Sequence, residues 1–123
     1  MSKLALVVDD SLTIRKLVSR TLQGVGFEVI EAVNGKDGLD KLEGRTMNVI
    51  ITDMNMPVMD GLEFVRGVRA TAAHKFTPVI FLTTEVDGSV RDAARAAGAT
   101  GWIVKPFSPE KVLSVVEKVV PAS

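Results

Sequence analysis

Short apolar runs alternate with amphipathic stretches along the whole chain. The run Val49-Ile50-Ile51 is rich in β-branched side chains and leads through Thr52 to Asp53, as expected of a buried strand. Between such runs, apolar side chains recur every three or four residues, which is the spacing of a helix with one buried face. The pattern predicts five strands, at residues 4–8, 27–32, 47–52, 78–82 and 101–104.

Polar caps and glycines predict where the intervening helices begin and end. Either Asp10 or Ser11 can cap the first helix, Asp60 and Glu63 are spaced as a capping box, and Ser108-Pro109 is a strong helix start. Residues 88–97 form an alanine-rich helix, and residues 70–77 form a loop. The apolar helix positions expected to face the core are Leu12, Ile14, Leu17, Val18, Leu22, Val25, Leu39, Leu42, Leu62, Val65, Val68, Val112, Val115, Val116 and Val119.

The alternation predicts an α/β fold. Strands that are apolar on both faces belong to parallel sheets covered by helices on both sides, and right-handed crossovers then favour an open, doubly wound sheet. The run 27–32 is the most polar and is expected at an edge. With 123 residues, the chain is expected to form a single domain over 1–123 without an output domain.

Composition excludes several classes of function. Lys and Arg together number 15, as do Asp and Glu, so no basic surface for nucleic acid or anionic membranes is expected. The chain has no cysteine, which excludes thiol catalysis and disulfides. There is no apolar run of membrane-spanning length, and the N-terminus does not resemble a signal peptide. A cytoplasmic location is therefore expected.

Polar residues follow four of the five predicted strands. Asp9 and Asp10 follow the first, Asp53 the third, Thr83 the fourth and Lys105 the fifth. The carboxyl ends of parallel strands share one edge of the sheet, so these side chains are expected to converge. Clustered carboxylates stay ionised only beside balancing cations. Lys105 supplies one positive charge, and Mg²⁺ suits the remaining oxygen ligands.

This combination predicts phosphoryl transfer to a carboxylate. The transition state is loose and carries its charge on the equatorial oxygens, so catalysis consists mainly of positioning and positive charge. Asp53 would be the nucleophile, Mg²⁺ and Lys105 would neutralise charge, and Thr83 would donate a hydrogen bond. His74 lies in the predicted polar loop, and no catalytic role is expected for it.

Four segments give the chain a resemblance to a known family. They are Val7-Val8-Asp9-Asp10-Ser11, Asp53-Met54-Asn55-Met56-Pro57-Val58-Met59-Asp60-Gly61, Thr83, and Lys105-Pro106-Phe107. Together they resemble the receiver domain of two-component response regulators, and most of all the CheY-like, single-domain chemotaxis regulators. The resemblance implies a flavodoxin-like (βα)5 fold with strand order 2-1-3-4-5. It also implies phosphoryl transfer to Asp53 from a phosphohistidine on a partner sensor histidine kinase.

The resemblance further implies how the metal is held. Asp10, Asp53 and the backbone carbonyl of Asn55 would hold Mg²⁺, and Asp9 would act through water. Lys105 would pair with the phosphoryl group, and its peptide bond to Pro106 would be cis.

Switching and dephosphorylation are implied in the same way. Thr83 and Trp102 would move on phosphorylation and alter the face formed by the fourth helix, fifth strand and fifth helix, where a downstream protein would bind. Asn55 and Glu85 would tune dephosphorylation, in which a phosphatase could take part. Trp102 stands where the family usually has tyrosine or phenylalanine, and Thr84 stands where a small residue is common.

Other interpretations compete with this one. The chain could be a receiver module from a larger regulator, for example a transcriptional one. A haloacid dehalogenase-type hydrolase would need a second acid where Asn55 stands, and a flavodoxin-like nucleotide binder would need a glycine-rich loop after the first strand. An interaction module without phosphorylation has no need of clustered acids. We therefore expect a phosphoacceptor that catalyses only its own modification, not an enzyme with a separate substrate.

Overall fold

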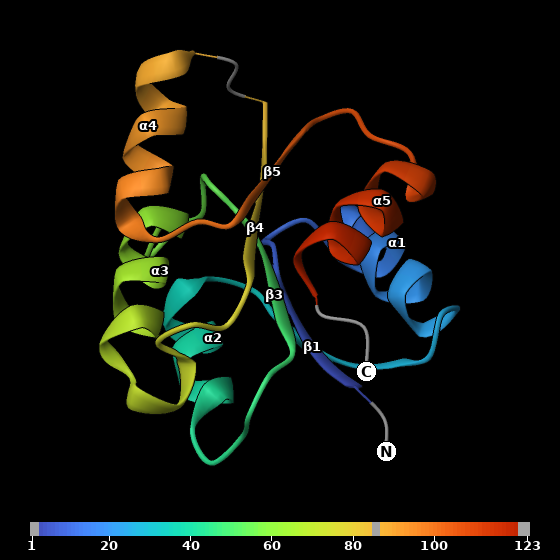
Figure 1. The fold of residues 1–123 in the computed structure, drawn as a ribbon, viewed down its shortest axis with the longest axis horizontal. Coiled ribbons are helices and arrows are strands. Elements are labelled where there is room, and N and C mark those ends of the chain that lie inside the picture. The colour runs from blue at the N-terminus through green and yellow to red at the C-terminus, as the bar shows by residue number, and fades with distance from the viewer. Residues whose placement is uncertain (1–2, 85–86, 121–123) are drawn as a thin grey trace.

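The computed structural model describes residues 3–84 and 87–120, and within these ranges a parallel sheet of five strands is covered by helices on both faces (Figure 1). The strand order is β2-β1-β3-β4-β5, which confirms the predicted doubly wound fold. The strands are β1 (Lys3–Val8), β2 (Phe27–Ala32), β3 (Val49–Asp53), β4 (Val79–Thr83) and β5 (Gly101–Val104). The helices are α1 (Leu12–Gln23), α2 (Gly35–Leu42), α3 (Gly61–Ala70), α4 (Gly88–Ala97) and α5 (Pro109–Val119), with a 3-10 turn η1 (Ala72–His74).

The strand order reverses on either side of β1. This strand pairs in parallel with β2 on one side and with β3 on the other, so Val8 lies beside both Ala32 and Thr52. The chain leaves β1 toward one edge of the sheet and returns to build the other half from β3. Open α/β sheets bind ligands at such a reversal, beyond the carboxyl ends of the strands.

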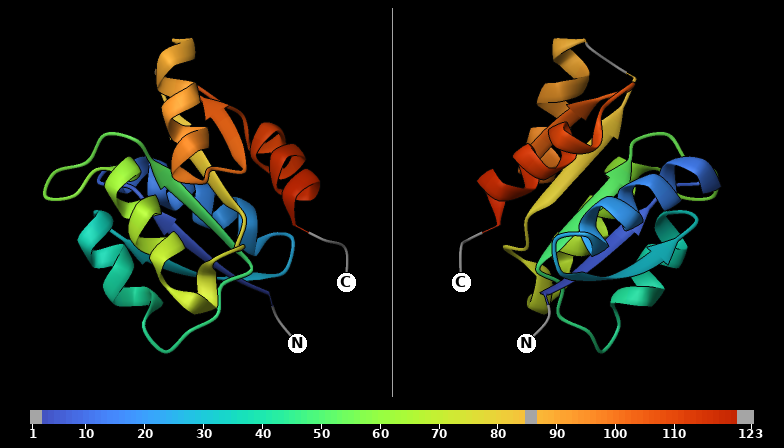
Figure 2. Two further views of the ribbon diagram at one scale, coloured as in Figure 1. Left: turned by 60° about the vertical axis from the view of Figure 1, so that its left-hand side comes forward. Right: turned by 90° about the vertical axis from the view of Figure 1, so that its right-hand side faces the viewer.

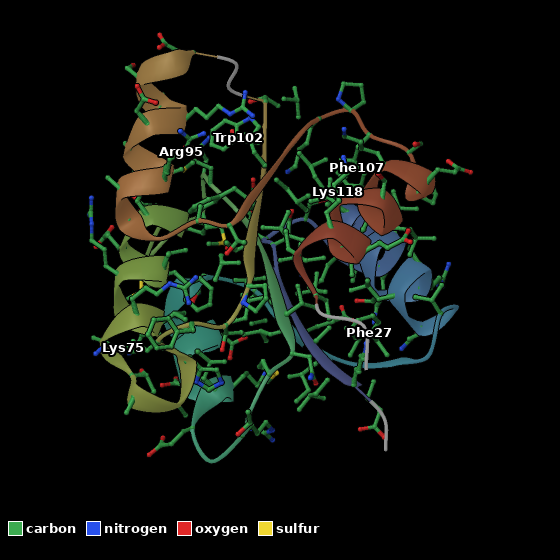
Figure 3. The ribbon with its side chains drawn as sticks, viewed as in Figure 1. Phe27, Lys75, Arg95, Trp102, Phe107 and Lys118 are labelled. Atoms are coloured by element: carbon green, nitrogen blue, oxygen red, sulfur yellow. The ribbon has the colours of Figure 1, made fainter. Side chains whose placement is uncertain are left out.

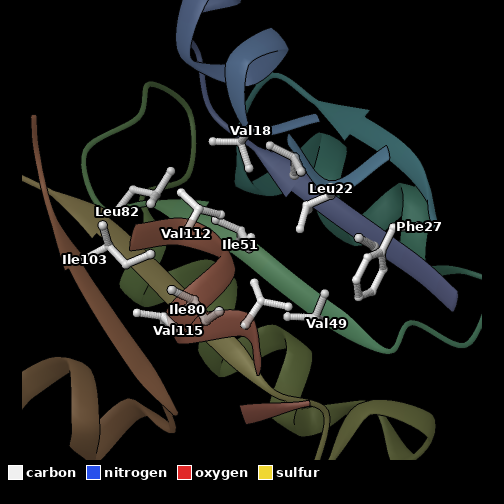
Figure 4. Close-up of a cluster of buried hydrophobic side chains, with 13 residues drawn as sticks. Val18, Leu22, Phe27, Val49, Ile51, Ile80, Leu82, Ile103, Val112 and Val115 are labelled. Carbon is white, nitrogen blue, oxygen red and sulfur yellow. The ribbon is translucent and has the colours of Figure 1, made fainter. Parts of the chain in front are cut away.

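Each face of the sheet has its own layer of helices (Figure 2). On one face, α1 and α5 pack against alternate residues of the strands, including Val7, Ile51 and Leu82 (Figure 4). The intervening residues, such as Leu6 and Ile50, pack against α2, α3 and α4. Because both sets are buried, the central strands β3 and β4 are apolar on both faces along most of their length, as parallel sheets require, whereas the edge strand β2 carries two glutamates.

Side-chain caps begin the helices at the predicted places. The Ser11 hydroxyl accepts a hydrogen bond from the Ile14 amide at 3.3 Å, so Ser11 and not Asp10 caps α1. Asp60 caps α3 in the same way through the Glu63 amide, at 2.9 Å. Since Ser11 caps the helix, the Asp10 carboxylate is not used as a cap and remains available for other contacts, two residues beyond the end of β1.

Some predicted core positions of the helices are not buried. Leu12, Leu17 and Val25 are 60%, 36% and 55% exposed, and Val25 lies beyond α1, which ends at Gln23. The helix does bury Val18 and Leu22, as predicted, together with Ser19. Val119 is only partly buried near the end of α5. These predictions were wrong because helical spacing shows which residues share a face, whereas the neighbouring elements decide how much of that face is covered.

The predicted loop 70–77 contains η1 and a fully buried histidine. His74 accepts a hydrogen bond from the Met47 amide through Nε2, at 3.2 Å, while Arg69 donates to the His74 carbonyl at 2.9 Å. Burial lowers the pKa of His74, and the nearby charge of Arg69 lowers it further. The polar surroundings expected for His74 were therefore wrong. Because Met47 precedes β3, the histidine ties η1 to the amino end of the sheet, away from the acidic residues.

No helix within the described ranges combines the length and hydropathy needed to cross a lipid bilayer.

Candidate functional site

Carboxylates from two strand ends meet a lysine from a third. Asp9 follows β1, and Asp53 is the last residue of β3. One oxygen atom from each of Asp9, Asp10 and Asp53 lies within 4.8 Å of the others. Lys105 Nζ lies 3.1 Å from Asp53 Oδ1 and 3.4 Å from Asp9 Oδ2. The structure thus brings together four residues from three segments that are far apart in sequence, as their positions at strand ends predicted.

Backbone hydrogen bonds hold these side chains in place. The Ser11 amide donates to Asp9 Oδ1 at 2.8 Å, and the Met54 amide donates to Asp53 Oδ1 at 2.9 Å. The Lys105 amide donates to the Thr83 carbonyl at 2.8 Å, which extends the pairing of β4 and β5 up to the lysine. The Lys105–Pro106 peptide bond is cis. Backbone amides therefore hold the carboxylates of Asp9 and Asp53, and the backbone of Lys105 is held at the end of β4.

Burial and like charge make this cluster costly without a further cation. Asp9 is fully buried, and this burial raises the pKa of its carboxyl group. The Ser11 amide and Lys105 lower that pKa, and the charge of Asp53 raises it. The net effect is a raised pKa, so one lysine does not compensate for the burial and repulsion of the acids.

The donor set fits a hard divalent ion. All the converging ligand atoms are carboxylate oxygens, and Asp10 is exposed, so an ion bound there could keep several of its waters. Mg²⁺ prefers this combination of a few carboxylates and retained water. The residues present therefore fit the magnesium ion that the sequence predicted.

Thr83 and Asn55, two further predicted site residues, differ in their exposure. Thr83 is the last residue of β4 and is 1% exposed, and the adjacent pairing of Leu82 with Asp53 places it at the same edge of the sheet. Asn55 is exposed in the loop after β3. Glu85 lies outside the described residues.

Trp102 lies on β5, on the face of the sheet covered by α4 (Figure 3). Its indole ring is partly buried and packs edge-to-face on Phe81 of β4, with ring centroids 6.4 Å apart and an interplanar angle of 60°. A cavity of about 90 Å³ beside it is lined in part by Arg91 and Arg95 of α4. Trp102 thus connects the strand that ends at Thr83 with the surface of α4.

One residue next to the site was not predicted. Arg15 of α1 donates through a terminal guanidinium nitrogen to the carbonyl oxygen of Asp9 at 2.9 Å, and through Nε to Glu31 of β2 at 2.9 Å. An arginine on an amphipathic helix is usually in solvent, so its residue type carried no signal. The position of Arg15 did give a signal. Helical side chains point back toward the N-terminus, and Arg15 lies one turn after Ser11.

Comparison with known proteins gives a consistent result. The family model described as response regulator receiver domain matches residues 5–117. The chemotaxis protein CheY1 of Helicobacter pylori is 41% identical over 116 residues, which cover 93% of this chain and 94% of that protein. The crystallised chemotaxis response regulator CheY4 of Vibrio cholerae is 47% identical, with a TM-score of 0.93 over 98% of this chain and 100% of that chain.

A more distant relative has the same architecture. The BeF3-activated receiver domain of DrrB, a Thermotoga maritima protein, is 33% identical with a TM-score of 0.86, and the match covers 97% of each chain. The family match and the relatives span nearly the whole chain. The chain therefore belongs to the response regulator receiver domain family of two-component signalling proteins.

Proposed function

We propose that Asp53 accepts a phosphoryl group from a phosphohistidine on a partner sensor histidine kinase, in a reaction that requires Mg²⁺. An Asp53 carboxylate oxygen forms a bond to phosphorus while the phosphorus–nitrogen bond breaks, and the electron pair of that bond stays on the imidazole. The observation that carries the proposal is the contact of Lys105 Nζ with Asp53 and Asp9, beside Asp10. Such an arrangement supplies positioned positive charge where the phosphoryl oxygens would lie.

The groups at the site would have different roles in metal binding and in contacting the phosphoryl group. Asp10, Asp53 and the Asn55 carbonyl would hold Mg²⁺, with Asp9 acting through water. The bound ion would neutralise negative charge on the phosphoryl oxygens. Lys105 would exchange its contact with Asp53 for one with a phosphoryl oxygen, and Thr83 would donate its hydroxyl hydrogen to another.

A downstream signal would follow from these changes in the contacts of Lys105 and Thr83. The Lys105 amide bonds the Thr83 carbonyl, and Trp102 lies between β4 and α4, so a shift at the ends of β4 and β5 can reach the α4–β5–α5 face. We infer that this face binds a downstream protein, and that the pathway is chemotaxis, since the relatives named above are chemotaxis proteins. Asn55 and Glu85 would set the rate of dephosphorylation, with or without a phosphatase.

Intact-protein mass spectrometry after incubation with acetyl phosphate tests the acceptor. We expect one phosphoryl adduct that needs Mg²⁺, is lost with a chelator and is absent in Asp53→Asn. Asp60→Asn is the matched control, because Asp60 lies in the same segment but caps α3. An adduct that persists in Asp53→Asn, or that forms equally without Mg²⁺, would show that the assignment is wrong.

A further inference from the structure

Arg15 brackets the short turn that carries Asp9 and Asp10. Its backbone amide donates to the Ser11 carbonyl at 2.9 Å, and its guanidinium donates to the Asp9 carbonyl at 2.9 Å. The amide bond is the i→i−4 bond of the first helical turn, which any residue at this position would make, and the guanidinium adds a second restraint on the other side of Asp10. The Arg15 side chain is only 13% exposed, so its hydrogen bond to Asp9 is partly shielded from water.

Glu31 of β2 fixes the arginine in turn. Its two carboxylate oxygens bind Arg15 Nε and Lys16 Nζ, each at 2.9 Å. Burial acts to raise the pKa of Glu31, but the hydrogen bonds and charges of Lys16 and Arg15 outweigh it and lower the pKa. The carboxylate thus stays ionised, and the planar guanidinium fork is held between Glu31 and the Asp9 carbonyl.

We propose that Arg15 is a positioning residue for the magnesium site, which holds the Asp9–Ser11 turn so that Asp9 and Asp10 converge with Asp53. The inference rests on the proposed function, since it concerns the same metal. Arg15 binds the backbone carbonyl of Asp9, so the carboxylates of Asp9 and Asp10 remain available to the ion. Groups that orient metal ligands from behind typically change metal affinity by about 10- to 100-fold when removed.

The sign of the effect separates positioning from charge. As a cation near the acids, Arg15 repels Mg²⁺, so removing its charge alone would strengthen binding. If Arg15 positions the turn, removing it weakens binding in spite of the lost repulsion. Lys16 is the matched control, because it is a cation on the same helix, bonded to the same Glu31, and no hydrogen bond or ion pair joins it to Asp9 in the described part of the chain.

Isothermal titration of Mg²⁺ into the full chain gives the first readout. We expect Arg15→Gln to raise the dissociation constant about tenfold, and Lys16→Gln to leave it unchanged or lower it. Arg15→Lys keeps the charge but cannot reach both partners, so its binding should also be weaker than wild type. Arg15→Gln or Arg15→Lys binding at least as tightly as wild type would overturn the proposal.

Amide hydrogen exchange without metal gives a second, independent readout. The Ser11 amide, which bonds Asp9 Oδ1, should exchange faster in Arg15→Gln than in Lys16→Gln while the central strands stay protected. Equal Ser11 rates would overturn the role of Arg15. Wild-type protein that binds no Mg²⁺ would instead refute the proposed function, and the exchange rates would still decide whether Arg15 holds the turn.

Discussion

Gly61 offers a sharp test of how α3 is joined to the acceptor strand. It is the first residue of α3, and its amide donates to the Met54 carbonyl at 2.8 Å. A Cβ at this position would collide with the carbonyl oxygen of Asp53 and would lie 2.6 Å from the ring of Phe81. The oxygen belongs to the backbone of β3 and the ring is fully buried, so neither can move aside easily.

Gly61→Ala should therefore destabilise the protein strongly. Overpacking of a core costs about 1–3 kcal/mol, and the rigid partners favour about 3 kcal/mol here. For a chain of this size, that free energy corresponds to a fall in Tm of roughly 10 °C. The new methyl group also pushes on the carbonyl of Asp53, so we expect less phosphoryl adduct from acetyl phosphate, even at a temperature where the variant is folded.

Gly88→Ala is the matched control. Gly88 is also the first residue of a helix and also follows an aspartate cap, but a Cβ there would meet no described heavy atom within 4 Å. This substitution should be neutral or should stabilise by about 0.4–1 kcal/mol through the unfolded state. Urea denaturation followed by circular dichroism measures both variants. A Gly61→Ala protein within about 0.5 kcal/mol of Gly88→Ala would refute the close packing of α3 on β3.

Three further predictions concern buried charge and backbone strain. The pKa of His74 is lowered in the fold, so on acidification the unfolded chain takes up this proton before the native chain does. The free energy of unfolding is therefore highest above pH 6.5 and falls below it, by at most about 1.4 kcal/mol per pH unit, until the native histidine also titrates. Urea denaturation at several pH values should show this loss in wild type and not in His74→Gln, and equal pH slopes would contradict it. The raised pKa of Asp9 gives the opposite sign, because its charged form is disfavoured in the fold, so stability is lost as pH rises toward 7. Asp9→Asn should then have a larger free energy of unfolding than metal-free wild type at pH 7. This difference should disappear in acid and should shrink when Mg²⁺ is added to wild type. A variant less stable than wild type would contradict the unfavourable burial of the Asp9 charge. Val58 has φ 71° although it is β-branched and 75% exposed, so Val58→Asn should stabilise by about 1 kcal/mol in urea denaturation, and a loss of stability would argue that the valine side chain has a packing role.

The local sequence pattern was sufficient to predict most of the helices and strands and the residues of the acidic cluster. The bounds of α4 and β5 agree with prediction, and Ser108-Pro109 begins α5. Periodicity, caps and glycines act over one or two turns, so they can be read without knowledge of the fold. The convergence of Asp9, Asp53 and Lys105 was also predictable, since the parallel direction of the strands places their carboxyl ends at one edge.

Long-range packing explains the errors. β3 begins at Val49 instead of residue 47, because Met47 gives its amide to His74, which is 27 positions away in the sequence. The exposure of Leu12 depends on what lies opposite the first turn of α1, which its own sequence does not encode. The strand order came from family resemblance, because strand length and polarity did not distinguish it from other arrangements.

The amino-acid order is therefore enough to predict that acids, a hydroxyl and a lysine follow buried strands, since each signal lies within a few residues of its strand. The exact geometry of the site required the folded chain. The 3.1 Å contact of Lys105 with Asp53 and the bridge from Arg15 to Glu31 join segments that only the sheet brings together. Such contacts depend on side-chain direction and burial, which are properties of the packed molecule and not of any single segment.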